Sequence, residues 1–218
     1  MKRAFDFCCA ATGLALLSPL LVTLGAMVWL EDRASPLFFQ ARVGQFGRRF
    51  WIWKFRTMVV NADQLGPSIT IGKDPRITRV GHWLRKTKLD ELPQLWNVLT
   101  GEMSLVGPRP EVAKYVELYT EEQRAVLRLR PGITDPASIE YYEESERLAA
   151  SEDAQATYIS EIMPAKLAIN LRYAHRAGLM KDAEVIIRTL LRMAGIRQTT
   201  AVASSEGKAG DAQVRRAA

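Results

Sequence analysis

The feature that most limits how this chain can fold is a stretch without a charged residue, residues 10–30. At about 1.5 Å per residue, a helix of this length can cross the roughly 30 Å hydrocarbon layer of a membrane. A cleaved signal peptide is an alternative because Lys2 and Arg3 precede the stretch, yet such peptides have an apolar region of only about 7 to 15 residues. The sequence therefore predicts a membrane anchor.

A Ser18-Pro19 pair lies near the middle of this stretch. Proline removes one backbone hydrogen bond and clashes with the preceding turn, so it bends or breaks a helix. The carbonyl that it frees is costly in lipid unless Ser18 or a neighbour satisfies it. Basic residues on both flanks place both ends on the cytoplasmic side. We therefore expect a re-entrant helix kinked at this pair, with an ordinary kinked span as the alternative because Glu31 and Asp32 weaken the charge signal.

The 218-residue chain has a formal net charge of +6, which predicts an anionic partner. Basic residues gather in residues 33–88, where the only acids are Asp63 and Asp74, and the balance reverses in residues 111–161. A nucleic-acid binder is more often basic throughout. No zinc-ligand spacing or RNA-binding aromatic motif is present either. We therefore expect a localised positive site and no nucleic-acid partner.

After the anchor, the pattern predicts a β-hairpin with strands at Leu37–Val43 and 50–58 around a turn at 44–47. A period of two places Lys54 and Arg56 on one face, and a solvated basic edge is the alternative to a binding role. Apolar periodicity predicts the helices that follow. Their expected ranges are 78–88, 92–99, 111–128, 153–177 with a break near Pro164, and 183–194.

Two polar features stand out in this body. Asp90 and Glu91 fall at a junction between helices, where helix capping is the ordinary role of such acids. A stiff Gly-Pro-Arg-Pro loop, residues 107–110, carries Arg109. A guanidinium held on a rigid segment loses little entropy when it grips a phosphate, although it can equally pair with a structural carboxylate.

Three ordered motifs, read together, resemble one family. They are Lys-Phe-Arg-Thr-Met at 54–58, Leu-Asp-Glu-Leu-Pro-Gln-Leu at 89–95 followed by Asn-Val-Leu at 97–99, and Met-Ser-Leu-Val-Gly-Pro-Arg-Pro-Glu at 103–111. This arrangement resembles the bacterial sugar transferases known as monotopic phosphoglycosyl transferases, in their minimal form. The resemblance covers the Ser18-Pro19 anchor and the body from about residue 38 to 132, and it resumes from Glu161 through Tyr173 and Asp182.

The resemblance implies a reaction in two displacements. Asp90 is the expected nucleophile, which attacks a UDP-sugar, releases UMP and carries the phosphosugar until a polyprenol phosphate, typically undecaprenyl phosphate, accepts it. Such covalent catalysis divides one difficult transfer into two. Glu91 is expected to hold Mg²⁺, together with Asp90. The expected phosphate contacts are Lys54, Arg56, Arg85 and Arg109.

The resemblance also implies a fold and a place. We expect an α/β protein with a re-entrant membrane helix, residues 1–32, and a small, mostly helical catalytic domain, residues 33–195, which has a short β-hairpin and interfacial amphipathic helices. Residues 196–218 are expected to form a disordered tail because they lack apolar periodicity. The expected location is the bacterial inner membrane, with the domain on the cytoplasmic face, where it would start glycan assembly. Downstream glycosyltransferases and a second copy of the chain are compatible partners.

The chain departs from the family pattern after residue 134, where Asp-Pro-Ala-Ser-Ile-Glu replaces the usual continuation. Residues expected to contact the sugar therefore do not carry over, and the sugar stays open. An N-acetylated sugar is the family-based expectation, while other members use galactose or glucose. The alternative function is a non-catalytic membrane scaffold that binds anionic lipid, which explains the anchor and the charge. It does not explain an acid pair inside a basic region.

Overall fold

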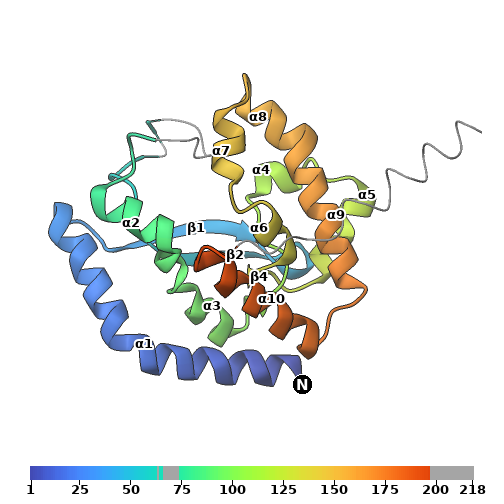
Figure 1. Ribbon diagram of the computed structural model, residues 1–218, viewed down its shortest axis with the longest axis horizontal. Helices are drawn as coiled ribbons and strands as arrows, with labels where there is room; N and C mark the ends of the chain where they lie inside the picture. Colours follow the sequence, from blue (N-terminus) through green and yellow to red (C-terminus); the bar gives the residue numbers. More distant parts are fainter. Residues whose placement is uncertain (63, 66–73, 197–218) are drawn as a thin grey trace, which may run out of the picture.

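The computed structural model describes residues 1–62, 64–65 and 74–196. It is mostly helical, with a short β-hairpin and an apolar N-terminal helix (Figure 1). The elements in chain order are α1 (Lys2–Asp32), β1 (Leu37–Val43), η1 (Gln45–Gly47), β2 (Arg49–Phe55), α2 (Arg79–Thr87), η2 (Leu89–Glu91), α3 (Gln94–Thr100), β3 (Ser104–Val106), α4 (Ala113–Val116), α5 (Glu121–Arg124), η3 (Ala125–Arg128), β4 (Gly132–Thr134), α6 (Pro136–Glu140), α7 (Glu144–Ala149), α8 (Ala154–Thr157), η4 (Tyr158–Ile162), α9 (Met163–Ala174) and α10 (Leu179–Met193).

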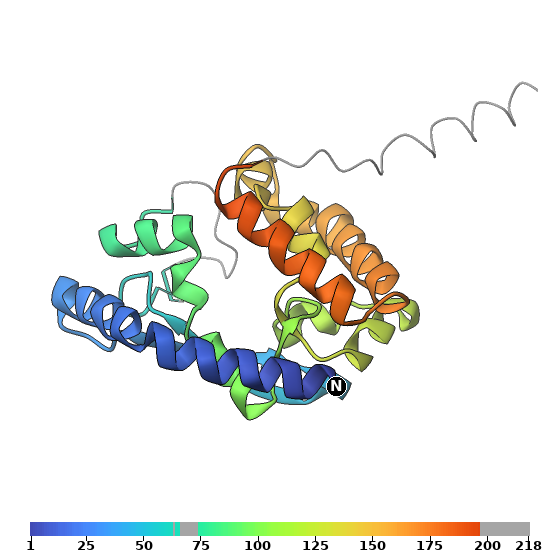
Figure 2. The ribbon, with the colours of Figure 1, turned by 60° about the horizontal axis from the view of Figure 1, so that its bottom comes forward.

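Helix α1 is long and apolar enough to cross a membrane by length and composition. It is one continuous helix with Pro19 inside it, and it bends near its middle (Figures 1 and 2). Proline cannot bond the carbonyl four residues before it, which is that of Ala15. The Ser18 hydroxyl donates to this oxygen at 2.8 Å. The predicted compensation by Ser18 is confirmed.

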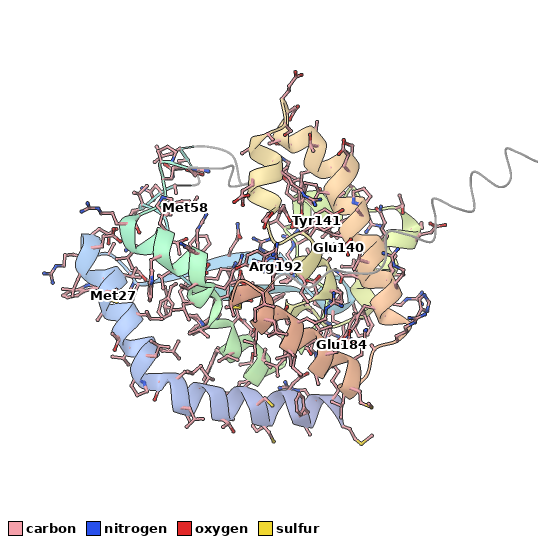
Figure 3. The ribbon with its side chains drawn as sticks, in the orientation of Figure 1. Met27, Met58, Glu140, Tyr141, Glu184 and Arg192 are labelled. Atoms are coloured by element: carbon pink, nitrogen blue, oxygen red, sulfur yellow. The ribbon has the colours of Figure 1, made fainter. Side chains whose placement is uncertain are left out.

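Both arms of α1 pack against the body. On the first arm, Ala10 is fully buried against Phe50 and Ile52 of β2 and Val98 of α3. On the second arm, which carries Met27 (Figure 3), the side chains of Leu24 and Val28 are buried in a separate cluster. The helix is therefore held to the same body before and after its bend.

A group of polar side chains fixes the beginning of α1, and we call it the N-terminal polar cluster: Lys2, Asp6, Ser104, Tyr173 and Asp182. Asp6 accepts from the Ser104 hydroxyl at 2.8 Å and from a backbone N–H of β3 at 3.2 Å. Lys2 donates to Asp182 and, at 3.0 Å, to the carbonyl at the end of β3. Tyr173 donates to the other oxygen of Asp182. The cluster thus joins α1, β3, α9 and α10.

Strands β1 and β2 form the predicted antiparallel hairpin, with Leu37 opposite Phe55 and Val43 opposite Arg49. The expected extent of the second strand, 50–58, was too long. Strand β2 ends at Phe55, and the backbone N–H of Arg56 then bonds the Pro36 carbonyl at 2.9 Å, outside the strand pair. Helices α2 and α3 lie where they were predicted, and Thr78 caps α2 by accepting from Gly81 N–H at 3.0 Å.

The single amphipathic helix expected over 111–128 is wrong. The segment is divided into α4, α5 and η3. A capping box causes the restart, because the Thr120 hydroxyl accepts from Gln123 N–H while the Gln123 side chain accepts from Thr120 N–H. The short parallel pair β3–β4, with Ser104 opposite Gly132, was not predicted. Three-residue strands carry too little periodicity to recognise.

The C-terminal helices α9 and α10 pack against β3, where Val106 is buried with Tyr173 and Val185. The break expected near Pro164 is confirmed as the π turn η4, which separates α8 from α9. Helix α10 buries Val185, whereas Ile187 and Leu190 are more than half exposed. The expected contact of amphipathic helices with a membrane interface stays a prediction. The disordered tail expected for 196–218 lies outside the described residues, apart from Ile196.

Candidate active site

A sharp turn between α2 and α3 presents the acid pair. Helix α2 ends at Lys88, which has a left-handed backbone with φ of 58°. This conformation is uncommon for a residue with a side chain, and it reverses the chain direction at once. The single turn η2 then carries Asp90 and Glu91, and Pro93 starts α3. Neither acid forms a side-chain cap in these turns, so the capping interpretation is wrong for both.

Helix α3 is held in place at its centre and at its C-terminal end. Its buried Asn97 bridges to the hairpin, because the side chain donates to Trp51 O at 2.7 Å and accepts from Trp53 N–H at 3.0 Å. At the C-terminal end of α3, Arg3 of α1 donates to the carbonyl of Leu99 at 2.7 Å. The turn that precedes α3 therefore has little freedom to move relative to α1 and β2.

Glu91 lies between two cations. Its Oε1 accepts from Lys54 Nζ at 2.9 Å and from Arg109, whose second nitrogen lies 3.2 Å from Oε2. Burial alone would raise the pKa of Glu91, but the charges of Arg109 and Lys54 outweigh it and hold that pKa well below its usual range. Burial lowers the pKa of Lys54, and Glu91 opposes this effect. Glu91 therefore stays ionised.

Two glycines position the loop that carries Arg109. A Cβ on Gly107 would lie 2.2 Å from Arg130 O, and one on Gly132 would lie 2.1 Å from Gly107 N. The two backbones are also bonded, since Gly107 N–H donates to Thr134 O at 3.0 Å. Only glycine allows this approach. The stiffness expected for residues 107–110 thus rests on strand β4 as well as on the two prolines.

Asp90 has a different environment from its neighbour. Its side-chain Oδ1 is buried and has no hydrogen-bond partner among the described residues. Burial, followed by the charge of Glu91, raises the pKa of Asp90, while Lys54, Lys88 and Arg109 oppose the shift. An unpartnered buried carboxylate oxygen is costly, and such atoms are rare outside functional sites. Asp90 is the strongest candidate for a reacting group in the described chain.

The structure brings most of the expected phosphate-binding residues together, but not all. Lys54 and Arg109 meet at Glu91, which excludes a solvated basic edge for Lys54. Arg85 lies near enough to Asp90 to feel its charge, and its Nε donates to Thr57 at 2.8 Å. Arg56 points elsewhere, because both of its terminal nitrogens bond Asp32 at 2.6 Å. Arg56 therefore connects β2 to the end of α1.

Lys88 was not among the expected site residues. Its charge acts on both Asp90 and Glu91, and its Nζ lies 5.5 Å from the ring centre of Tyr142. It takes part in no salt bridge of the described residues. The sequence signal for Lys88 is its position two residues before Asp90, at the end of an expected helix, where the helix dipole commonly explains a lysine.

A cavity of about 770 Å³ opens beside the acid pair. This volume falls within the roughly 300–1,000 Å³ of known ligand sites. Its polar wall includes Lys88, Glu91 and Arg109, whereas Asp90 is not among the lining residues and is 8% exposed. Tyr141, directly after α6, and Arg192, on α10, also line the cavity and are labelled in Figure 3.

The segment that departs from the family pattern forms part of this cavity. Asp135 caps α6 by accepting from Ser138 N–H at 3.0 Å, which folds the segment into a short helix. Residues Ser138, Ile139, Tyr141 and Tyr142 then lie on the cavity wall. The divergent sequence is therefore placed where it can contact a ligand.

The acid pair is a limited metal site by itself. The part of the chain that the structure describes has no group of three or more His, Cys, Asp or Glu side chains that could hold a metal ion. Mg²⁺ is often held by only one or two carboxylates, with substrate phosphates and water as the other ligands. The unpartnered oxygen of Asp90 fits such a role, whereas both oxygens of Glu91 are already bonded.

The chain is similar to several characterised proteins. It is 43% identical over 149 residues to a UDP-galactose-lipid carrier transferase of Erwinia amylovora, a match that covers 62% of this chain and 31% of the relative. It is 35% identical to a UDP-N-acetylgalactosamine-undecaprenyl-phosphate N-acetylgalactosaminephosphotransferase of Aeromonas hydrophila, over 87% of this chain and 43% of the relative. It is 34% identical to a UDP-glucose:undecaprenyl-phosphate glucose-1-phosphate transferase of Escherichia coli, over 88% of this chain and 40% of the relative.

The chain thus spans less than half the length of each of these three relatives. The model of one family, the bacterial sugar transferases, matches residues 1–195, which include α1, the hairpin, the acid pair and the Arg109 loop. This match extends over nearly all of the described chain. The resemblance seen in the motifs is confirmed: the chain belongs to the bacterial sugar transferase family.

Proposed function

We propose that the protein transfers a phosphosugar from a UDP-sugar to a polyprenol phosphate, with Asp90 as the covalent nucleophile. The observation that carries the proposal is the buried Asp90 oxygen without a partner, beside a Glu91 that is already neutralised by two cations. The names of the relatives support the substrate classes, because two of the three name undecaprenyl phosphate and all three name a UDP-sugar.

The two displacements balance as follows. In the first, an Asp90 oxygen bonds the phosphorus that carries the sugar, the bond from that phosphorus to the bridging oxygen breaks, and UMP leaves. In the second, a phosphate oxygen of the polyprenol phosphate bonds the same phosphorus and releases the Asp90 carboxylate. Splitting the transfer in this way is the usual benefit of covalent catalysis. The product is a polyprenol diphosphate sugar.

Positive charge makes an attack by a carboxylate on a diphosphate feasible. Lys88 has no salt bridge among the described residues and is therefore available to a phosphate on the cavity wall. Arg109 lies on the same wall, and Lys54, which does not line the cavity, donates to the same Glu91 oxygen. Fixed charges of this kind stabilise phosphoryl transfer without reorganisation. The Asp90 side chain turns toward the phosphates from its position beside the cavity.

Glu91 has a positioning role in this scheme. It holds Arg109 and Lys54 in place through three hydrogen bonds. When bound, Mg²⁺ would be held by Asp90 and Glu91 and would offset charge on the phosphoryl oxygens. Because both Glu91 oxygens are engaged by cations, Asp90 is the better ligand of the two. The carboxylate of Asp90 would therefore be both the main protein ligand of the metal and the nucleophile.

The anchor fits the lipid acceptor. The phosphate of such a lipid lies at the membrane surface, so the active site has to lie at the same depth. In this proposal α1 is a re-entrant anchor that returns to the side it entered, and the packing of its two arms on one body supports this topology. By the positive-inside rule, that body lies on the cytoplasmic face of the inner membrane. UDP-sugars are available in this compartment.

The sugar is left to experiment, since the three relatives name galactose, N-acetylgalactosamine and glucose. The purified protein in detergent is incubated with Mg²⁺ and one UDP-sugar at a time, without lipid acceptor. We expect a phosphosugar adduct in the intact mass and an equal amount of UMP. Asp90→Asn is the matched control and gives neither. Absence of both signals with every UDP-sugar rejects the proposal in favour of a lipid-binding scaffold. Normal reaction of Asp90→Asn rejects Asp90 as the nucleophile.

A further inference from the structure

The cavity has two walls of different chemistry. The polar wall carries the charges of Lys88, Glu91 and Arg109. The other wall is apolar and is built by side chains from six parts of the chain. These side chains are Phe5, Cys9, Leu92, Leu95, Leu105, Ile133, Ile139, Ile186, Leu190 and Met193. A ligand that fills the cavity therefore needs an anionic head and a hydrocarbon body.

The apolar wall opens between two helices. Helices α1 and α10 are joined at their beginnings by the Lys2–Asp182 ion pair, and they diverge from this contact (Figures 1 and 2). The cavity lies between them, with Phe5 and Cys9 on the side of α1 and Leu190 and Met193 on the side of α10. Its apolar end therefore reaches the first turns of the membrane helix.

The rim of this opening exposes large apolar side chains. Phe5 is 39% exposed, Leu190 59% and Met193 38%. Contiguous exposed apolar surface at the edge of a cavity marks a binding site for an apolar ligand or a membrane. Here the surface continues into α1, whose own exposed side chains include Phe7, Leu16 and Leu20. Exposed apolar side chains therefore occur both at the cavity and along α1.

We propose, on the basis of the function proposed above, that the prenyl chain of the acceptor lipid leaves the active site between the first turns of α1 and the last turns of α10. Its phosphate lies at Lys88 and Arg109, and its first isoprene units lie against Cys9 and Leu190. A long polyprenyl chain is too large for the cavity, so the remainder stays in the hydrocarbon layer. Helix α10 is then a wall of the lipid path as well as a part of the core.

A matched pair on α10 tests this path. Leu190 lines the cavity, whereas Ile187 is equally exposed, at 57%, and does not line it. Leu190→Trp narrows the opening and is expected to raise the KM for undecaprenyl phosphate roughly tenfold, the effect of losing contacts worth about two buried methylene groups. The defect should shrink with a short-chain prenyl phosphate. Ile187→Trp should leave the KM unchanged for undecaprenyl phosphate and for the short-chain prenyl phosphate.

The first half-reaction, adduct formation and UMP release without lipid, serves as the readout of intact folding and chemistry. We expect it to be unchanged in both variants, because the UDP-sugar does not use the lipid path. If both variants form the adduct but share the same lipid KM, the path is rejected while the proposed function stands. If the wild-type protein forms no adduct, the proposed function itself fails.

The adjacent cysteines supply a second test that needs no turnover. Cys9 lines the cavity and Cys8 does not, although Cys8 is the more exposed. Cys8→Ser and Cys9→Ser each leave one thiol for a membrane-permeant maleimide. Undecaprenyl phosphate should slow labelling of Cys9 in the first variant and not that of Cys8 in the second. Equal protection of the two thiols, or protection of neither, contradicts the path.

Discussion

Buried acids occur in two regions of this molecule, and the regions treat them in opposite ways. In the N-terminal polar cluster, Asp6 and Asp182 each accept hydrogen bonds on both carboxylate oxygens. In the active site, Glu91 is similarly satisfied, but Asp90 keeps a buried oxygen without a partner among the described residues. The two regions are only a few residues apart along β3 and the Arg109 loop.

The difference in hydrogen bonding distinguishes acids that stabilise the fold from an acid that is available to react. A buried carboxylate with all of its hydrogen bonds made stabilises the fold, because removing a partner leaves an uncompensated polar group. A buried carboxylate that lacks a partner lowers the stability of the folded protein. This loss is offset only when a ligand binds the carboxylate or a new bond forms. Asp6 and Asp182 thus hold α1 to the body, and Asp90 is held ready to react. The same substitution in both regions should therefore give opposite results.

The largest effect is expected from Asp90→Asn. The variant should lose adduct formation by at least about 10³-fold, because the nucleophile is gone. Its thermal unfolding midpoint at pH 7 should be unchanged or higher, since the ionised form of Asp90 is disfavoured by burial in the folded protein. Intact mass and thermal unfolding in detergent measure the two properties. A clear drop in the midpoint would show that Asp90 has a structural partner after all.

The second effect is expected from Asp182→Asn, the same change in the other region. It removes the charge partner of Lys2 and should lower stability by about 1–3 kcal/mol, seen as a lower unfolding midpoint. Adduct formed per folded molecule should stay near the wild-type level, because the side chain touches no reacting group. If activity falls while the midpoint does not change, the cluster contributes to catalysis and the contrast breaks down.

The sequence predicted the position of the active site far better than that of the N-terminal polar cluster. Local signals identified the long apolar N-terminal helix, its bend at Ser18-Pro19 and the hairpin, because each depends on residues close together in the chain. The acid pair was placed correctly at a helix junction, yet the residues alone favoured capping. What made the chemistry visible was the motif order. The sequence could not show that Glu91 has hydrogen-bond partners on both oxygens while Asp90 has an oxygen without one.

The N-terminal polar cluster was out of reach for a physical reason. Lys2 and Asp182 are 180 positions apart, and no periodicity links them. Arg56 shows a related limit, because the family resemblance, and not a local pattern, implied a phosphate contact for it. In the structure, β2 ends at Phe55, and the Arg56 side chain forms an ion pair with Asp32 at the end of α1. Contacts between distant segments decide such roles.

The smallest expected effect tests how finely the active site is tuned. Asp90 has to be ionised to attack, so adduct formation falls when the pH drops through its raised pKa. Lys54 lowers that pKa by its charge. Lys54→Met should therefore raise it and move the acidic limb of the pH–rate profile to higher pH, while Glu91 keeps its partner Arg109. Lys86→Met, on the exposed side of α2, makes the same change in net charge and should not move the limb. Equal shifts in both variants would mean that overall charge, and not the arrangement around the acid pair, sets the ionisation of Asp90.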